Sequence, residues 1–167
     1  MESKTETQIK KDLKNRKLTV LREFDAPVEL VWRAWTESLL LDQWWAPRPW
    51  KAITKSFSFW NGGSWLYAMT GPDGTAVWCL VEFSGINQGK SFQAKSSFCD
   101  ENGKINPEFP VMYWKNVFKG MGSETLVEVE ISFTAEADME KIIAMGFEAG
   151  FTMGLGNLDE LLKMPNI

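Results

Sequence analysis

The feature that most constrains this chain is a long amphipathic helical pattern near its C-terminal end, at residues 138–163. Placed at 100° per residue, its apolar side chains fall on one face: Met139, Ile143, Phe147, Phe151, Leu158, Leu161 and Leu162. Asp138 suits the N-cap, and Pro165 disfavours helical geometry at the residue before it. The pattern predicts one helix of roughly 26 residues, about 39 Å long. Because a lone helix cannot bury such a face, a sheet has to cover it.

Two glycines, Gly150 and Gly154, lie within this apolar face. A glycine inside a helix costs about 1 kcal/mol relative to alanine. Either another backbone approaches closely there, or space is kept open for a ligand. Open space predicts that Gly154→Ala is neutral or stabilising, whereas a packed backbone predicts that it is destabilising. We expect open space, and Gly156, on the solvent face of the wheel, is the control.

Composition excludes several classes of function. The 167 residues suit one domain, and the net charge of −4 argues against nucleic acid as a partner. The absence of histidine excludes Ser-His-Asp and Cys-His catalysis and His-ligated zinc, and we expect no metal and no cofactor. No membrane span or signal peptide is visible. Cys79 and Cys99 fall out of register with each other, which predicts two free thiols and a reducing compartment, the cytoplasm.

The N-terminal third reads as a strand followed by two helices. Residues 1–15 are polar and predict a mobile extension, or a short helix around residues 9–13. A single domain is expected over residues 16–164, beginning with a strand at 16–24. Asp25 and Pro27 then start a helix with one buried face, and a short helix at 38–44 follows.

The middle of the chain predicts an antiparallel meander. Strands separated by turn signals such as Asn61-Gly62 are expected at residues 51–60, 63–70, 76–84, 91–99, 112–119 and 125–134. The fold class is therefore α+β: a curved seven-stranded antiparallel sheet wrapped around the long C-terminal helix, with two short helices between its first two strands. Pairing Thr70 with Thr75 and Ser84 with Lys90 places one set of side chains under the helix: Trp65, Tyr67, Met69, Trp78, Leu80, Glu82, Phe92, Phe98, Met112, Trp114 and Phe118. A one-residue slip would invert any of these strands.

Several motifs in this order are similar to those of a known family. Residues 18–50 read LTVLREFDAPVELVWRAWTESLLLDQWWAPRPW, and they are followed by Gly62-Gly63, Pro72-Asp73-Gly74, Thr125, Met145-Gly146-Phe147, Gly150 and residues 158–162, LDELL. The chain resembles the START-like (SRPBCC) helix-grip superfamily over residues 18–162, and more narrowly the family named after the activator of the heat-shock protein 90 ATPase. The resemblance implies a helix-grip fold with a cavity between the long helix and the sheet. Some members of the superfamily bind lipids, sterols or polyketides, and a few are cyclases or other enzymes.

The leading hypothesis is binding of a small hydrophobic or amphipathic molecule in that cavity, without a cofactor. The candidate ligand-binding residues are Trp45, Trp65, Tyr67, Met69, Trp78, Glu82, Phe98, Met112, Trp114, Phe118, Phe147, Gly150, Phe151, Gly154, Asn157 and Leu158. One alternative is a cyclase or isomerase that uses Glu82 or Tyr67 with bound water; we favour binding over catalysis. Another is a chaperone-interacting protein, by analogy with the family name alone.

A few residues allow two interpretations. An inward, unpartnered Glu82 could be a general acid or base, but contact with solvent or with a cation is favoured. Asn157 either bonds the sheet edge or orients a ligand group. Arg22 is expected in a structural ion pair. One of Trp44 and Trp45 is expected to anchor the helices under the sheet edge and the other to line or gate the pocket, with packing favoured for both.

Overall fold

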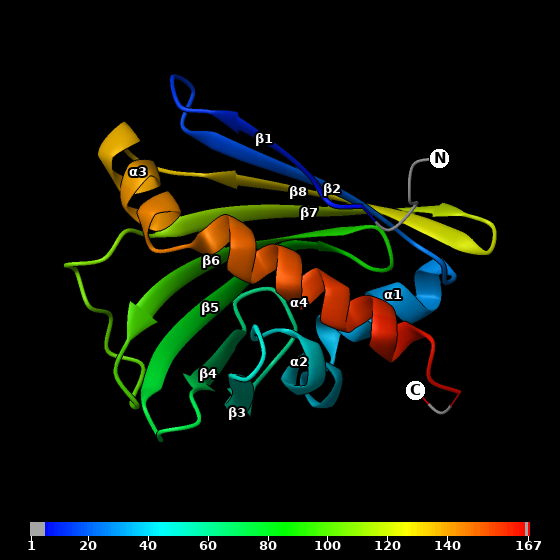
Figure 1. Cartoon of the computed structure of the whole chain (residues 1–167), viewed down its shortest axis with the longest axis horizontal. Helices are drawn as coiled ribbons and strands as arrows, with labels where there is room; N and C mark the ends of the chain where they lie inside the picture. Colours follow the sequence, from blue (N-terminus) through cyan, green and yellow to red (C-terminus); the bar gives the residue numbers. More distant parts are fainter. Residues whose placement is uncertain (1–5, 166) are drawn as a thin grey trace.

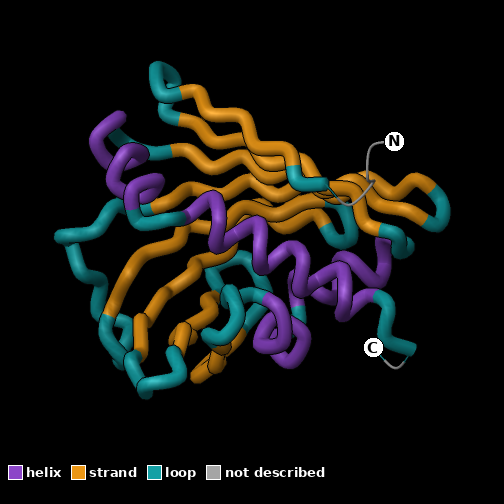
Figure 2. The backbone as a smooth tube through the Cα atoms, viewed as in Figure 1, coloured by secondary structure: helices purple, strands orange, loops and turns teal. Residues whose placement is uncertain are grey.

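In the computed structural model, which describes residues 6–165 and 167, one curved sheet surrounds a C-terminal helix. The elements are β1 (Gln8–Asp12), β2 (Lys17–Phe24), α1 (Val28–Thr36), α2 (Ser38–Trp44), β3 (Lys51–Phe57), β4 (Ser64–Thr70), β5 (Ala76–Asn87), β6 (Ser91–Cys99), β7 (Met112–Met121), β8 (Glu124–Ser132), α3 (Glu136–Ala144) and α4 (Phe147–Leu162). The antiparallel strand order is β1-β2-β8-β7-β6-β5-β4-β3. Figures 1 and 2 show α4 lying across the concave face, with α1 and α2 beside its C-terminal half. This is the predicted α+β helix-grip architecture.

The sheet has eight strands, so the prediction of seven is wrong. The added strand, β1, lies in the segment for which an extension or a short helix was predicted, and it pairs with β2 from Gln8–Leu21 to Asp12–Lys17. The Asp12 carboxylate holds the intervening turn by accepting hydrogen bonds from the backbone and side chain of Asn15. Residues 1–5 of the predicted extension lie outside the described residues.

The two short helices form nearly where predicted. The N-cap of α1 is Pro27, with no side-chain cap, so Asp25 does not cap the helix as expected. The α1 side chains pack on the sheet: the rings of Trp32 and Phe118 of β7 lie 5.1 Å apart, edge to face. The indole N–H of the fully buried Trp44 donates to the Ala34 carbonyl, 2.9 Å away, and fixes α2 against α1. Trp44 is therefore the anchor that the sequence predicted of one tryptophan.

The C-terminal helix is broken, which corrects the prediction of one continuous helix from 138 to 163. Helix α3 begins at Glu136, with Ala135 rather than Asp138 as its N-cap, and it ends before Met145 and Gly146. Gly146 adopts φ +88°, a left-handed conformation that terminates helices and that glycine adopts without strain. Helix α4 then runs in a new direction to Leu162, and α3 lies at the end of the sheet away from α1 and α2 (Figure 1).

Helix α4 packs directly on the backbone that follows α2. A Cβ at Gly154 would lie 3.1 Å from the Trp45 carbonyl oxygen and 3.4 Å from that of Trp44. The Asn157 side-chain amide donates to the Ala46 carbonyl at 3.1 Å and to the Trp44 carbonyl at 3.4 Å. The open-space explanation is therefore wrong for Gly154, which permits close packing of two backbones. It remains valid for Gly150, where a Cβ would meet only Pro47 Cγ, at 3.8 Å.

Strand β5 is inverted relative to the prediction. Thr70 pairs with Ala76 rather than with Thr75, because the turn holds five residues and closes with a bond from the Gly71 N–H to the Thr75 carbonyl. The inner face of β5 therefore carries Cys79 instead of Trp78. A bulge between Ser84 and Asn87 shifts the next pairing to Ser84–Gln93, which restores the predicted face of β6.

Arg22 forms the structural ion pair that the sequence predicted. Its guanidinium, 6% exposed, pairs with Asp159 of α4 and also donates to the Thr7 hydroxyl at 2.7 Å. The pair joins β2 to α4, and the contact with Thr7 brings in the chain just before β1. Removing either partner would leave the other charge buried and uncompensated. The ion pair therefore fixes α4 to the sheet.

Candidate functional site

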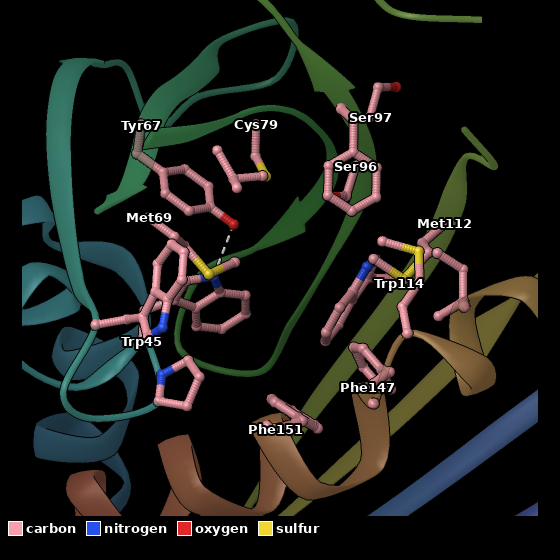
Figure 3. A pocket seen from close by; sticks show the side chains of 18 residues that line it. Trp45, Tyr67, Met69, Cys79, Ser96, Ser97, Met112, Trp114, Phe147 and Phe151 are labelled. Atoms are coloured by element: carbon pink, nitrogen blue, oxygen red, sulfur yellow. Dashed lines mark hydrogen bonds between the residues drawn. The ribbon is translucent and has the colours of Figure 1, made fainter. Parts of the chain in front are cut away.

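A cavity of about 300 Å³ with a mainly aromatic and aliphatic lining lies between α4, the inner faces of β4 to β7 and the segment after α2 (Figure 3). We call it the main cavity. It is lined by Trp45, Pro47, Trp50, Tyr67, Met69, Val77, Cys79, Ser96, Ser97, Phe98, Met112, Trp114, Ile142, Met145, Gly146, Phe147, Gly150 and Phe151. Nine of the sixteen candidate residues belong to this set: Trp45, Tyr67, Met69, Phe98, Met112, Trp114, Phe147, Gly150 and Phe151.

Aromatic rings form one wall of the main cavity. Phe147 and Phe151 project from α4 towards Trp114 of β7, as Figure 3 shows. The Trp114 ring meets Phe151 edge to face with centroids 5.4 Å apart, and it meets Phe147 edge to face at 5.9 Å. Such edge-to-face pairs hold their rings in fixed orientations, so this wall is preformed.

A side-chain hydrogen bond lies in the opposite wall, next to a buried thiol. The Trp45 indole N–H donates to the Tyr67 hydroxyl at 2.8 Å (Figure 3), and Cys79 lines the cavity on the neighbouring strand β5. Burial raises the pKa of Tyr67 well above its ordinary value of 10.0, and it raises the pKa of the Cys79 thiol to about 12. Both groups are therefore neutral at physiological pH. They can orient a ligand by hydrogen bonding, but neither is an anionic nucleophile or base under those conditions.

A second, smaller cavity of about 30 Å³ lies behind Trp45 and Trp114, and we call it the inner chamber. It shares Trp45, Ser96 and Trp114 with the main cavity and is also lined by Trp35, Leu41, Trp65, Val81, Phe83, Phe92, Ala94 and Asn116. Trp65, one of the predicted ligand-binding residues, lines this chamber rather than the main cavity. Its indole donates to the Thr54 hydroxyl at 2.9 Å.

Six further predicted residues lie outside both cavities. Trp78 and Glu82 face outward on β5 because of the register slip, and Glu82 is exposed. Phe118 and Leu158 are buried in the hydrophobic core. Gly154 and Asn157 contact the backbone after α2, as described above. Glu82 therefore meets solvent, which is the interpretation that the sequence favoured.

Sequence reasoning missed lining residues for three reasons. Val77 and Cys79 were missed because the predicted register of β5 was off by one residue. Pro47 and Trp50 were missed because they lie in a loop, whose path no periodicity predicts. Ile142, Met145 and Gly146 reach the cavity only because the C-terminal helix is broken. Ser96 and Asn116 could have been found, because they alternate with the predicted Phe98, Met112 and Trp114 on the same faces of β6 and β7.

The described residues contain no group of three or more His, Cys, Asp or Glu side chains placed to hold a metal ion. Cys79 and Cys99 are free thiols, as predicted. Among the helices formed by described residues, none has the length and apolarity needed to cross a bilayer.

A curved antiparallel sheet gripping a C-terminal helix, with an apolar cavity between them, defines a START-like helix-grip protein. Within that class, the chain belongs to the family of Activator of Hsp90 ATPase homolog 1-like proteins, whose model matches residues 25–163.

Solved structures share this fold. The chain is similar to a protein from Arthrobacter aurescens, with 30% identity, a TM-score of 0.89 and coverage of 95% of this chain and 92% of that one. It is also similar to a Mycobacterium smegmatis protein, with 26% identity, a TM-score of 0.87 and coverage of 96% and 99%. An AHSA1 protein from Silicibacter pomeroyi shares the fold, at 16% identity, a TM-score of 0.70 and coverage of 87% and 96%. A comparison with curated proteins found no match.

Proposed function

We propose that this protein binds a small apolar or amphipathic molecule in the main cavity. The observation that carries the proposal is the cavity itself, whose volume of about 300 Å³ is lined mainly by aromatic and aliphatic side chains. Small-molecule sites are typically concave, mostly apolar and about 300–1,000 Å³ in volume, with a few convergent polar groups. The hydroxyl of Tyr67 supplies such a group here.

The lining combines rigid and adaptable parts. Trp45 and Trp114 are fixed by ring contacts and, for Trp45, by its bond to Tyr67. Met69, Met112 and Met145 also line the cavity, and an unbranched thioether side chain can adjust to ligands of different shape. Met145 is half exposed, which places it at the mouth. The arrangement suits a receptor for related apolar molecules.

Titration calorimetry with a panel of medium-chain alcohols, medium-chain fatty acids and naphthalene derivatives tests the proposal. We expect at least one saturable site with micromolar affinity, about −8 kcal/mol, and a negative heat-capacity change from burial of apolar surface. A flat response to every compound would overturn the proposal.

A matched pair of variants locates the site. Leucine at Gly150 would extend into the main cavity, since a Cβ there has only Pro47 within 4 Å, and it should weaken binding at least tenfold. Leucine at Gly156 is the control, because a Cβ there meets nothing within 4 Å and the residue lines no cavity described above. Equal affinities of the two variants would place the binding elsewhere.

The two alternatives have less support. The cyclase or isomerase hypothesis loses Glu82, which is exposed on the outer face, and retains Tyr67 alone. The chaperone hypothesis rests on the name of the family, and no surface described above adds to it. A reducing compartment, the cytoplasm, stays a prediction that two free thiols support.

A further inference from the structure

The inner chamber differs from the main cavity in its polar groups. Three of the residues that line it carry buried side-chain polar atoms without a hydrogen-bond partner in the described chain: Trp35 Nε1, Trp114 Nε1 and Asn116 Oδ1. These residues are 3%, 6% and 2% exposed. Buried polar groups are nearly always paired, and an unpaired one costs stability. Three around one small space indicate a missing partner.

Three other indoles of this region have hydrogen-bond partners. The indoles of Trp44, Trp45 and Trp65 donate to the Ala34 carbonyl, the Tyr67 hydroxyl and the Thr54 hydroxyl respectively. The unpaired atoms are therefore not a general property of its tryptophans. They belong to one residue of α1, Trp35, and to two residues of β7, Trp114 and Asn116, all of which line the chamber.

The size of the inner chamber limits what can enter it. Its volume of about 30 Å³ has room for one water molecule or one group of similar size, and not for a ring. Because it shares Trp45, Ser96 and Trp114 with the main cavity, the two spaces adjoin at these three side chains. The chamber is thus the deep end of the same site.

The chemistry of the three atoms limits the group further. Two indole N–H groups are donors only, and the Asn116 oxygen is an acceptor. A hydroxyl matches this set, since its oxygen accepts from the indoles while its proton goes to Asn116. None of the described side chains lining either cavity is charged, so a carboxylate or an ammonium ion would be buried without a counter-charge.

We propose that the inner chamber binds the terminal hydroxyl of the ligand, so that the ligand class is an apolar alcohol whose hydrocarbon body fills the main cavity. The inference rests on the proposed function. It adds the polarity of the ligand and its direction, with the hydroxyl end innermost. In the absence of ligand, one water molecule can make the same three contacts.

The test compares 1-octanol with 1-methoxyoctane by titration calorimetry. The ether has no proton for Asn116 and carries an extra methyl group, so we expect the alcohol to bind about tenfold more tightly, the effect of about one hydrogen bond. Asn116→Leu should abolish this preference by weakening alcohol binding about tenfold while leaving ether binding unchanged. The control is Thr36→Val, which removes a buried hydroxyl that bonds the Trp32 carbonyl and lines neither cavity, and it should leave the preference intact.

A second measurement needs no variant. In ¹⁵N-labelled protein, 1-octanol should shift the indole Nε1–H resonances of Trp35 and Trp114 more than that of Trp65, whose donor is already engaged. Equal affinities for alcohol and ether, or an unshifted Trp35 and Trp114 pair on saturation with alcohol, would overturn this inference and leave the proposed function standing. If neither these compounds nor any other of the calorimetric panel bound, both would be overturned.

Discussion

Alanine substitution at three glycines of α4 should separate two kinds of contact along one helix. At Gly154 the added methyl lies 3.1 Å from the Trp45 carbonyl oxygen and 3.4 Å from that of Trp44. The side-chain amide of Asn157 donates hydrogen bonds to the Trp44 and Ala46 carbonyls, on either side of Trp45. This backbone segment can therefore move little. Overpacking of about 1–3 kcal/mol exceeds the gain of about 1 kcal/mol in helix propensity. We expect Gly154→Ala to lower the free energy of unfolding by about 1 kcal/mol.

The other two positions should respond in the opposite direction. A methyl at Gly150 meets Pro47 Cγ at 3.8 Å, an ordinary contact, and one at Gly156 meets nothing within 4 Å. Each alanine should therefore raise the free energy of unfolding by up to about 1 kcal/mol through helix propensity and the restricted unfolded chain. Urea melts monitored by circular dichroism measure all three variants. If Gly154→Ala were as stable as Gly156→Ala, the close approach of the two backbones would not constrain this helix.

Three further outcomes are expected. Arg22→Met should destabilise the fold by about 3 kcal/mol in urea melts, because Asp159 would lose its buried partner; a change within 0.5 kcal/mol would show that the pair contributes little. Burial raises the pKa values of Tyr67 and Cys79 above their ordinary values of 10.0 and 9.0. The contribution of these two groups to stability should therefore be constant between about pH 6 and 8 and fall as the pH rises through 9 and 10, by up to about 1.4 kcal/mol per pH unit for each group. Melting temperatures that stay level to pH 10.5 would contradict this. Glu82→Gln should change ligand affinity less than threefold, about 0.65 kcal/mol, because the side chain faces solvent outside the cavities. A larger change in affinity, measured by calorimetry, would show that Glu82 contributes to the site.

Local patterns predicted the elements better than the contacts between them. The bounds of β6 and α2 were correct, and those of β6 were marked by the turn residues on either side of the strand. The face of β5 was wrong because a five-residue turn and a four-residue turn fit the same Gly-Pro-Asp-Gly signal, and only the pairing of Thr70 with Ala76 decides between them. Gly146 is a possible helix-terminating residue in the sequence. The break was missed because the apolar periodicity on either side of it favoured one continuous helix.

The prediction of cavity-lining residues also succeeded where local patterns decide and failed where tertiary contacts decide. Side chains that alternate on β4, β6 and β7 were found, because strand periodicity alone places them on one face. Gly150 and Gly154 are four residues apart on one helical face, yet the first borders a cavity and the second a backbone. That difference depends on where the loop after α2 crosses α4, which is a tertiary contact without a local signal. Asn116 was passed over because a polar residue between apolar ones resembles a solvent-facing position.

The pairing of β1 with β2 changes which strand forms the edge of the sheet. Edge strands present unpaired N–H and C=O groups on which another chain can add a strand. Strand β2 is longer and regularly alternates buried and less buried residues, so it would be a good template, whereas β1 is short and carries the exposed charges of Lys10 and Lys11. At the opposite edge, β3 carries Lys51 and Lys55 and is interrupted by a bulge between Thr54 and Ser56. Both edges of this eight-stranded sheet thus carry features that disfavour the addition of a strand, and β1 covers the more regular strand β2.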